Sequence, residues 1–379
     1  MSNPVFGSNR LKLGIFAHNG RGPSQTLVPE AHQATSWDMA LRTSQIADRA
    51  GFEAVVAFAR WKGYLAGQPE HRSGDVMDPF VWAGGIAQAT EHCAVFATAH
   101  APTLHPIVAA KQSTTVDMIS GGRFVLNVVG GWNKPELEMF GAPFKEHDQR
   151  YDHLAEWLTV IKRLWTEHDE FDFHGEFFDV IKGVSTPKPV QTPRPPIMNA
   201  GGSPRGQRFA AEHADLCFVN ITAEDPDGIR AQVDGYRNLA ADEFGREVAV
   251  WTNTFVVQRG TDDEAQAYLH RYAVEYEDTA SVDAWLRLQG ENAKLMPVEA
   301  LAAMRLRFAA GVGGFPLVGT ADHIAERLET LSDCGIDGVL MTWVNYDDGL
   351  ARFTDEVMPR LEKAGLRAPF EPTLQHRSP

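Results

Sequence analysis

FVLNVVGGWNKPELEMFGAPFKEHDQRY, residues 124–151, is the stretch from which the fold is best predicted. It opens with a short apolar run rich in β-branched residues, which is typical of a buried strand. Asn127 interrupts that run, and an amide inside an apolar strand needs hydrogen-bond partners. The strand ends at Gly130 and Gly131, where the backbone can approach another group closely. Four later side chains complete what we interpret as one wall of a cofactor site: Trp132, Glu136, Arg150 and Tyr151.

Short apolar runs alternate with helical segments along the rest of the chain. Such alternation favours a parallel α/β sheet, and eight predicted strands indicate a (β/α)8 TIM barrel. The rival architecture is an open doubly wound sheet, which usually places a G-x-G-x-x-G turn after its first strand. The glycines at that point are Gly20 and Gly22, without that spacing. The predicted strands are residues 12–17, 54–59, 93–97, 124–129, 197–200, 216–220, 248–257 and 338–343.

Two segments do not fit the barrel pattern and are predicted insertions in a single domain spanning residues 1–379. The first, about 166–196, follows strand four and has β character, with paired phenylalanines and a proline run. The second, about 277–315, follows strand seven; we expect a helix from Ser281 to Met304 and then a loop at residues 311–314. That helix and loop are a candidate lid over the site. Residues 370–379 are expected to be a loose tail.

Composition limits the kinds of partner that the protein can have. The 379 residues carry a formal net charge of −15, which disfavours a nucleic-acid surface because such surfaces usually have a basic excess. Three scattered cysteines indicate a reducing compartment and neither a zinc cluster nor a disulfide framework. No signal-peptide pattern or membrane-spanning apolar run is found. We therefore expect a cytoplasmic protein that contacts neither nucleic acid nor membrane.

Barrel enzymes carry their chemistry at the C-terminal ends of the strands. These ends lack a carboxylate pair, which argues against a glycosidase, and a G-x-S-x-G elbow, which argues against a serine hydrolase. The strand ends also contain no compact pair of histidines, so the sequence does not predict a metal site. A cofactor that brings its own reactivity is the remaining interpretation. The strand-end residues include Arg21, Arg60, Trp61, Thr98, His100, Asn127, Trp132, Ser203, Asn220, Asn253 and Trp343.

The best candidate for phosphate binding is Gly201-Gly202-Ser203. A glycine turn at a helix N-terminus presents free N–H groups and the positive end of the helix dipole. Arg150 could add a charge-assisted hydrogen bond. The alternative is that Ser203 only caps its helix and that Arg150 lies on a surface face, and taken alone these residues favour that alternative.

Longer motifs carry a family resemblance over nearly the whole chain. The chain resembles the bacterial luciferase-like flavin monooxygenases, and most of all the group of pyrimidine, dimethyl sulfone and alkanesulfonate monooxygenases. The resemblance implies a TIM barrel, reduced FMN delivered by a separate NAD(P)H:flavin reductase, and a flavin peroxide that oxygenates the substrate. It also implies a homodimer or homotetramer. The motifs are AAKQSTTVDMISGGRFVLNVVGGWNKPE (109–136), EHDQRYDHLAEW (146–157), NAGGSPRGQRFAAEHAD (199–215) and PLVGTADHIAERL (316–328).

The resemblance also implies roles for individual residues. Thr98 and Asn127 are the candidate donors to the peroxide, and Trp132 shares the dioxygen pocket with them. Phe218 and Val56 match positions near the substrate or dioxygen, and Trp61, His100 and Trp343 are further candidates for substrate contact. The flavin contacts that the resemblance implies are Ala59, Arg60, Asn127, Glu136, Arg150, Tyr151 and Ser203. Gly202 is added to these candidates as part of the glycine turn.

Several alternatives stay open at this point. Asn127 could be a core amide, Trp132 could serve packing alone, and His100 could be a loop residue that faces solvent. Strand seven reads WTNTF (251–255), without the arginine and histidine of the alkanesulfonate enzyme, which disfavours a sulfonate. We therefore expect a small neutral heterocyclic or organosulfur substrate. The rival activities are a deazaflavin-dependent oxidoreductase that transfers hydride on the same barrel and a non-catalytic flavin-binding relative.

Overall fold

Eight parallel strands close into a barrel in the computed structural model, which describes residues 3–65, 67–289 and 298–371. Each strand pairs with the next in the barrel order, and a pairing between β8 and β9 closes the ring. The predicted fold class is confirmed. The strands are β1 (Lys12–Phe16), β2 (Ala54–Val56), β3 (Ala94–His100), β4 (Phe124–Val129), β7 (Ile197–Asn199), β8 (Leu216–Phe218), β9 (Ala249–Gln258) and β11 (Gly338–Thr342).

Alternate residues of each strand fill the barrel interior, because successive side chains of a strand point to opposite faces. Phe96 of β3, Val125 of β4 and Trp251 of β9 belong to one buried apolar cluster, which plugs the barrel. The intervening residues, such as Val95 and Leu126, belong to the larger cluster under the helices. This parity decides which strand-end side chains can face a site at the barrel mouth.

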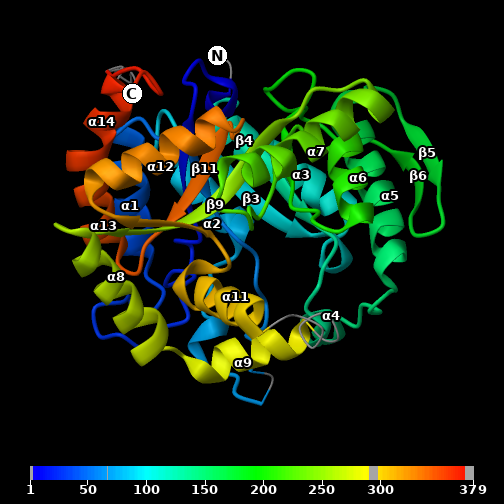
Figure 1. Cartoon of the computed structure of the whole chain (residues 1–379). Helices are drawn as coiled ribbons and strands as arrows, with labels where there is room; N and C mark the ends of the chain where they lie inside the picture. The colour runs from blue at the N-terminus through cyan, green and yellow to red at the C-terminus, as the bar shows by residue number, and fades with distance from the viewer. Residues whose placement is uncertain (1–2, 66, 290–297, 372–379) are drawn as a thin grey trace.

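Helices surround the barrel, as Figure 1 shows. Several begin where an aspartate or serine caps the first turn and proline occupies the first helical position, as in Asp78-Pro79 and Asp225-Pro226. Such a pair fixes a helix start, since the side chain accepts a free N–H and proline needs none. The helices around the barrel are α1 (Trp37–Arg49), α2 (Pro79–Ala89), α3 (Pro106–Ser120), α5 (His147–Thr166), α6 (Pro204–His213), α7 (Pro226–Phe244), α8 (Asp262–His270), α12 (Ala321–Asp333), α13 (Tyr346–Arg352) and α14 (Met358–Lys363).

The first insertion contains a two-stranded antiparallel hairpin of β5 (Phe171–His174) and β6 (Asp179–Gly183). The hairpin lies at the edge of the molecule beside α5, away from the centre of the barrel (Figure 1). The predicted β character is therefore confirmed. Between β4 and α5, the short helix α4 (Lys134–Met139) carries Glu136 in its first turn.

The second insertion is partly helical, with α9 (Thr279–Leu288) and α11 (Val298–Gly311) lying at the end of the molecule opposite the two termini (Figure 1). Residues 290–297 of the predicted helix lie outside the described residues. The prediction was wrong at Phe315, which begins a strand, β10 (Phe315–Gly319), that pairs in parallel with β9. Because β8 pairs only with residues 249–251 of β9, β10 continues the same side of that strand at residues 254–258.

The predicted loose tail is described only in its first two residues, and residues 372–379 lie outside the described part. Phe370 packs its ring on His92, with 4.4 Å between ring centroids. Just before it, buried Arg367 forms an ion pair with Glu53 at 3.2 Å. The C-terminal segment is thus held against the barrel as far as Phe370.

Candidate active site

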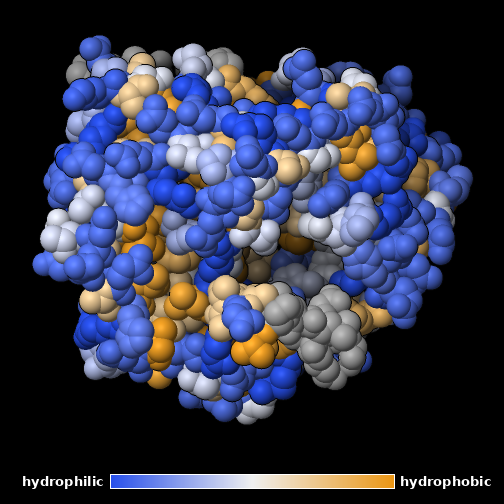
Figure 2. Space-filling view, viewed as in Figure 1, coloured by the Kyte–Doolittle hydropathy of each residue, from blue (hydrophilic) through white to orange (hydrophobic). Residues whose placement is uncertain are grey.

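A cavity of about 620 Å³ lies at the C-terminal ends of the barrel strands. This volume suits a small molecule or a cofactor with its substrate. The space-filling view shows a hollow on this face, next to α11 (Figure 2). The cavity therefore lies at the end of the barrel where the sequence predicted the chemistry. The predicted site residues that line it are Val56, Ala59, Arg60, Thr98, His100, Asn127, Trp132, Arg150 and Phe218.

Two predicted substrate contacts, Trp61 and Trp343, do not line this cavity and need correction. Trp343 is buried and packs its ring on Tyr346 and Phe353, outside the barrel. Trp343 directly follows β11, in which Leu340 faces the cavity, and a residue three positions further along an extended chain faces outward. The Trp61 side chain is 41% exposed and lies edge-on against Phe140 beside α4.

Thr98 and Asn127 are direct partners across β3 and β4, and their side chains are hydrogen-bonded. Asn127 Nδ2 donates to Thr98 Oγ1 at 2.9 Å, and Thr98 Oγ1 donates its proton to the Ala57 carbonyl at 2.6 Å. The hydroxyl proton of Thr98 is thus already used. Asn127 is the member of the pair with capacity left for a bound group, since its Oδ1 is buried without a partner among the described residues.

Glu136 lies behind the cavity wall rather than on it. Its Oε1 is 2.5 Å from His100 Nδ1, and its Oε2 accepts the Trp61 backbone N–H at 2.9 Å. Burial by itself raises the pKa of Glu136, but the hydrogen bond and charge of His100, the Trp61 N–H and the charge of Arg60 together outweigh it, and the net pKa is lowered. The carboxylate therefore holds His100 in place, and His100 is the member of this pair that reaches the cavity.

The predicted phosphate residues gather at the N-terminus of α6. Ser203 Oγ accepts the Gly206 N–H at 3.1 Å, so the capping role is real, and it also lies 3.0 Å from His147 Nε2. The His147 ring packs against Tyr151, with 5.3 Å between centroids. A Cβ added at Gly202 would meet nothing within 4 Å, so this turn is open. Ala200, which precedes the turn, lines the main cavity.

Arg150 lies between the main cavity, which it lines, and the glycine turn at the N-terminus of α6. Its Nη1 donates to the Gly131 carbonyl at 2.8 Å, and its guanidinium lies over the Phe144 ring, 4.9 Å from the centroid. Arg150 Nε is buried without a partner among the described residues, as is Asn253 Oδ1 on the opposite side of the cavity. A buried polar atom without a partner is costly, so these atoms mark places where a bound group is expected to form hydrogen bonds.

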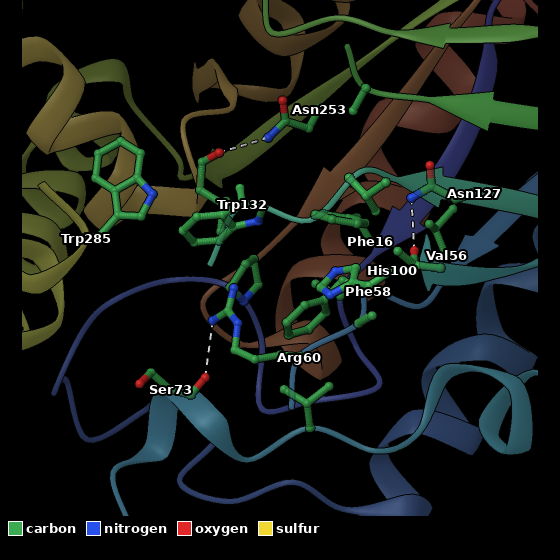
Figure 3. Close-up of a pocket in the computed structure, with 18 of the residues that line it drawn as sticks. Phe16, Val56, Phe58, Arg60, Ser73, His100, Asn127, Trp132, Asn253 and Trp285 are labelled. Carbon is green, nitrogen blue, oxygen red and sulfur yellow. Dashed lines mark hydrogen bonds between the residues drawn. The ribbon is translucent and has the colours of Figure 1, made fainter. Parts of the chain in front are cut away.

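Figure 3 shows how side chains from distant segments meet in the cavity. Arg60 lies between Trp132 and Ser73, and its Nη1 donates to the Ser73 carbonyl at 3.1 Å. Trp285 enters from α9, and its ring stacks on Phe308 of α11 with 3.8 Å between centroids. Sequence reasoning missed Trp285, and also Arg72, because each lies far from any strand end. Only the approach of their segments in space brings them to the site.

Two kinds of feature are absent from the part of the chain that the structure describes. In residues 3–65, 67–289 and 298–371, no cluster of histidine, cysteine, aspartate and glutamate is arranged to hold a metal ion. Within the same ranges, no helix is both long enough and apolar enough to cross a bilayer.

Comparison with known proteins agrees with the fold. Residues 11–338 match the family model for luciferase-like monooxygenases. The FMNH2-dependent dimethylsulfone monooxygenase of Pseudomonas putida is 32% identical, over 93% of this chain and 95% of that protein. Pyrimidine monooxygenase RutA of Acinetobacter baylyi is 27% identical, over 96% and 98%. The crystal structure of long-chain alkane monooxygenase superposes with a TM-score of 0.83 at 23% identity, over 97% of this chain and 94% of that one. The chain therefore belongs to the family of luciferase-like monooxygenases.

Proposed function

We propose that this protein is a two-component monooxygenase that uses reduced FMN and dioxygen to oxygenate a small organic molecule. The observation that carries the proposal is the cavity at the barrel mouth, with its unpartnered polar atoms beside an open helix N-terminus. Family membership supports the reaction class. The relatives named FMNH2-dependent monooxygenases support the choice of cofactor.

The residues present fit an FMN molecule in their donor and acceptor chemistry. Asn127 Oδ1 is an acceptor suited to a ring N–H, and Arg150 Nε is a donor suited to an anionic or carbonyl oxygen. The turn at Gly202 and Ser203 offers backbone N–H groups and a helix dipole to a phosphate. The residues that would hold FMN are Ala59, Arg60, Asn127, Arg150, Tyr151, Gly202 and Ser203.

Reduced FMN supplies the electrons with which dioxygen is activated. The protein's own contribution is to position the reactants and to exclude water, which strengthens hydrogen bonds inside the cavity. Phe16, Phe58 and Phe218 form a row of rings along one wall, with centroids 6.1–6.2 Å apart, and supply an apolar surface. Trp132 faces the same space.

His100 is the candidate group for moving a proton. Because Glu136 accepts at Nδ1, a neutral His100 keeps its proton on Nδ1 and leaves the Nε2 lone pair free for the cavity. A histidine that is oriented by a carboxylate and directed at a reaction site is a common form of general base. Glu136 is a positioning residue in this proposal, and the cofactor contact that the family resemblance implied for it is replaced by this role.

The partner and the substrate complete the proposal. Reduced FMN comes from a separate NAD(P)H:flavin reductase, because the chain has no G-x-G-x-x-G turn after its first strand. The substrate is a heterocyclic or organosulfur molecule small enough to share the cavity with the isoalloxazine ring. We further propose that the protein works in the cytoplasm as a homo-oligomer.

Binding of FMN can be tested at Ser203 with a matched control. Ser203→Ala removes the hydroxyl that caps α6, and Ser36→Ala removes the equivalent cap of α1, where Ser36 does not line the cavity. Each change is expected to cost about 1 kcal/mol of stability. Only Ser203→Ala should weaken FMN binding, measured by quenching of tryptophan fluorescence during titration. Equal FMN affinities in the two variants would contradict the proposed phosphate position.

The reaction itself is tested by supplying reduced FMN from an unrelated reductase and following oxygen uptake with candidate heterocycles and organosulfur compounds. The proposal expects product only in the presence of dioxygen. Product formed without dioxygen, together with reduction of an added deazaflavin, would instead indicate a hydride-transferring oxidoreductase. No flavin binding at all would indicate that the proposed function is wrong.

A further inference from the structure

Positive charge is concentrated in the cavity although the protein as a whole is strongly acidic. The formal net charge of the chain is −15. Among the residues that line the cavity, four are arginines and one is an aspartate, Asp75. One of the arginines, Arg150, lies toward the proposed phosphate site. The other three, which we call the arginine cluster, come from the loops after β1 and β2: Arg21, Arg60 and Arg72.

Arg21 is the central member of the arginine cluster. It lies on the loop after β1, lines the cavity and is only 5% exposed. Its Nε donates to the Arg72 carbonyl at 3.4 Å, a long hydrogen bond. Within the described ranges, no hydrogen bond or ion pair is found for its two terminal nitrogens. A buried guanidinium in this state has most of its donors available for a bound group.

The other two guanidiniums are held in place by backbone carbonyls and, for Arg72, also by the Gln33 side-chain oxygen at 2.7 Å. Arg60 donates to the Ser73 carbonyl and lies over the Tyr64 ring, 4.2 Å from its centroid. Arg72 donates to the Thr26 carbonyl at 2.9 Å. Burial lowers the pKa of Arg21 to about 10, and the charges of Arg72 and Arg60 contribute to that shift, so the three cations lie close enough to repel one another.

Neighbouring carboxylates do not neutralise the arginine cluster directly. Asp278 and Asp75 are near enough to raise the pKa of Arg21, which partly opposes the effect of burial. Asp278 already accepts hydrogen bonds from the Ser281 backbone and hydroxyl and lies 3.3 Å from His71 Nε2. Asp75 accepts the Thr35 N–H at 2.8 Å. None of the ion pairs found among the described residues includes a member of the arginine cluster.

We propose that the substrate carries an anionic group, a carboxylate or a sulfonate, which the arginine cluster binds while the rest of the molecule lies along Phe16 and Phe58. The proposal rests on the proposed function and deepens it by naming the chemical class of the substrate. Planar guanidiniums suit such oxygens because they donate two parallel hydrogen bonds. The sequence disfavoured a sulfonate because strand seven lacks basic residues, but the cluster supplies the positive charge from other loops.

The arginine cluster is distinct from the proposed cofactor phosphate site, although one of its members, Arg60, is also a proposed contact of the flavin. The barrel order is β1-β2-β3-β4-β7-β8-β9-β11, so the loops after β1 and β2 lie nearly across the barrel from β7, which leads into Ser203. One FMN phosphate cannot occupy both places. An anionic group on a second molecule is what remains for the arginine cluster.

The test uses two probes of nearly equal size and different charge. Benzenesulfonate carries an anionic sulfonate, and methyl phenyl sulfone replaces one of its oxygens with a neutral methyl group. Both are titrated calorimetrically into the full-length protein saturated with oxidised FMN. We expect benzenesulfonate to bind at least about tenfold more tightly, since hydrogen bonds to charged groups are about twice as strong as neutral ones. Equal affinity for the two probes would overturn the proposal.

Variants then assign the effect to the arginine cluster. Arg21→Gln should weaken benzenesulfonate binding by about ten- to a hundredfold and leave the sulfone unaffected. Arg21→Lys, which keeps the charge, should lose less, and this variant separates loss of charge from loss of folding. Arg42→Gln is the control, because Arg42 pairs with Asp347 on the surface. Unchanged benzenesulfonate binding in Arg21→Gln would refute the assignment.

Affinity for FMN separates this inference from the proposed function. If Arg21→Gln weakens FMN binding as much as benzenesulfonate binding, the arginine cluster holds the cofactor phosphate and the inference is wrong. If the unaltered protein binds no FMN but the protein without FMN still prefers the sulfonate to the sulfone through Arg21, the proposed function fails while the anion site stands.

Discussion

Replacing Glu136 with glutamine tests the proposed role of His100 with little change in shape. The Trp61 N–H needs an oxygen acceptor, so the amide oxygen of the introduced glutamine must take the place of Oε2. The amide NH2 then faces His100 Nδ1, which must become an acceptor. The proton of neutral His100 is thereby moved to Nε2, and the nitrogen directed at the cavity changes from an acceptor to a donor.

Both hydrogen bonds survive in Glu136→Gln, so the protein should fold. Each hydrogen bond changes from charge-assisted to neutral, which lowers the free energy of unfolding by about 1 kcal/mol per bond, or about 2 kcal/mol in all. The net decrease is smaller, because the variant no longer buries a charged carboxylate. The pKa of Glu136 in the folded protein is lowered from the ordinary value of 4.5. The ionised carboxylate therefore stabilises the folded protein fully above pH 4.5, and this stabilisation is lost as the pH falls through the pKa of the folded state. The stability difference between the two proteins should therefore narrow below about pH 4.5.

Activity should fall far more than stability. A wrongly protonated base typically costs about 100- to 10,000-fold in rate. We expect that loss in kcat, with FMN affinity unchanged, and a shift of the histidine ¹⁵N signals from the Nδ1–H to the Nε2–H tautomer. Glu138→Gln is the matched control, because Glu138 lies on the same helix and pairs with Lys134 on the surface.

Two results would refute this reasoning. Unchanged kcat in Glu136→Gln would remove His100 from proton transfer. Loss of FMN affinity with the original tautomer retained would show that Glu136 contacts the cofactor, as the family resemblance implied.

Three further predictions follow from the packing. Thr98→Val leaves Asn127 Nδ2 without its acceptor. The rate of substrate oxygenation should therefore fall at least about 100-fold, and reduced FMN should be consumed with release of hydrogen peroxide. An unchanged ratio of product formed to reduced FMN consumed would contradict this prediction. Gly338→Ala would place a Cβ 2.4 Å from Trp251 and should lower the free energy of unfolding by about 1–3 kcal/mol, whereas Gly235→Ala, with nothing within 4 Å, should raise it by up to about 1 kcal/mol. Burial raises the pKa of all three cysteines, Cys93, Cys217 and Cys334. None of them should therefore react quickly with Ellman's reagent at pH 8 until the protein is unfolded. A fast reaction of the folded protein would show that a thiol is accessible and would contradict this prediction.

Much of the fold could be predicted because local signals determine it. Apolar runs such as residues 124–129 are strands because their residues are β-branched and buried on both sides. The β10 strand escaped prediction because it is short, contains Pro316 and follows a glycine-rich turn, all of which argue against a strand. Its backbone is ordered by pairing with β9, a contact that local sequence does not encode.

Strand parity explains which of the predicted site residues line the cavity. Thr98 and His100 lie two residues apart and face the cavity together. Trp343, which directly follows β11, has the opposite parity to the cavity-lining Leu340 and packs outside the barrel. Arg72 could not be predicted in the same way. It lies sixteen residues after β2, and its place in the cavity depends on how the long loop folds back against the loop after β1.

The attachment of the second insertion has a consequence for how such barrels diversify. The chain leaves β9 into α8, makes α9 and α11, and returns as β10 to pair with the same β9. The segment between β9 and β10 thus begins and ends at the same barrel strand, β9. Exchanging this segment therefore requires no other barrel strand to move. A graft of residues 277–311 from a relative should therefore change the cavity contacts made by Trp285, while the host barrel retains its arginine cluster and its cofactor.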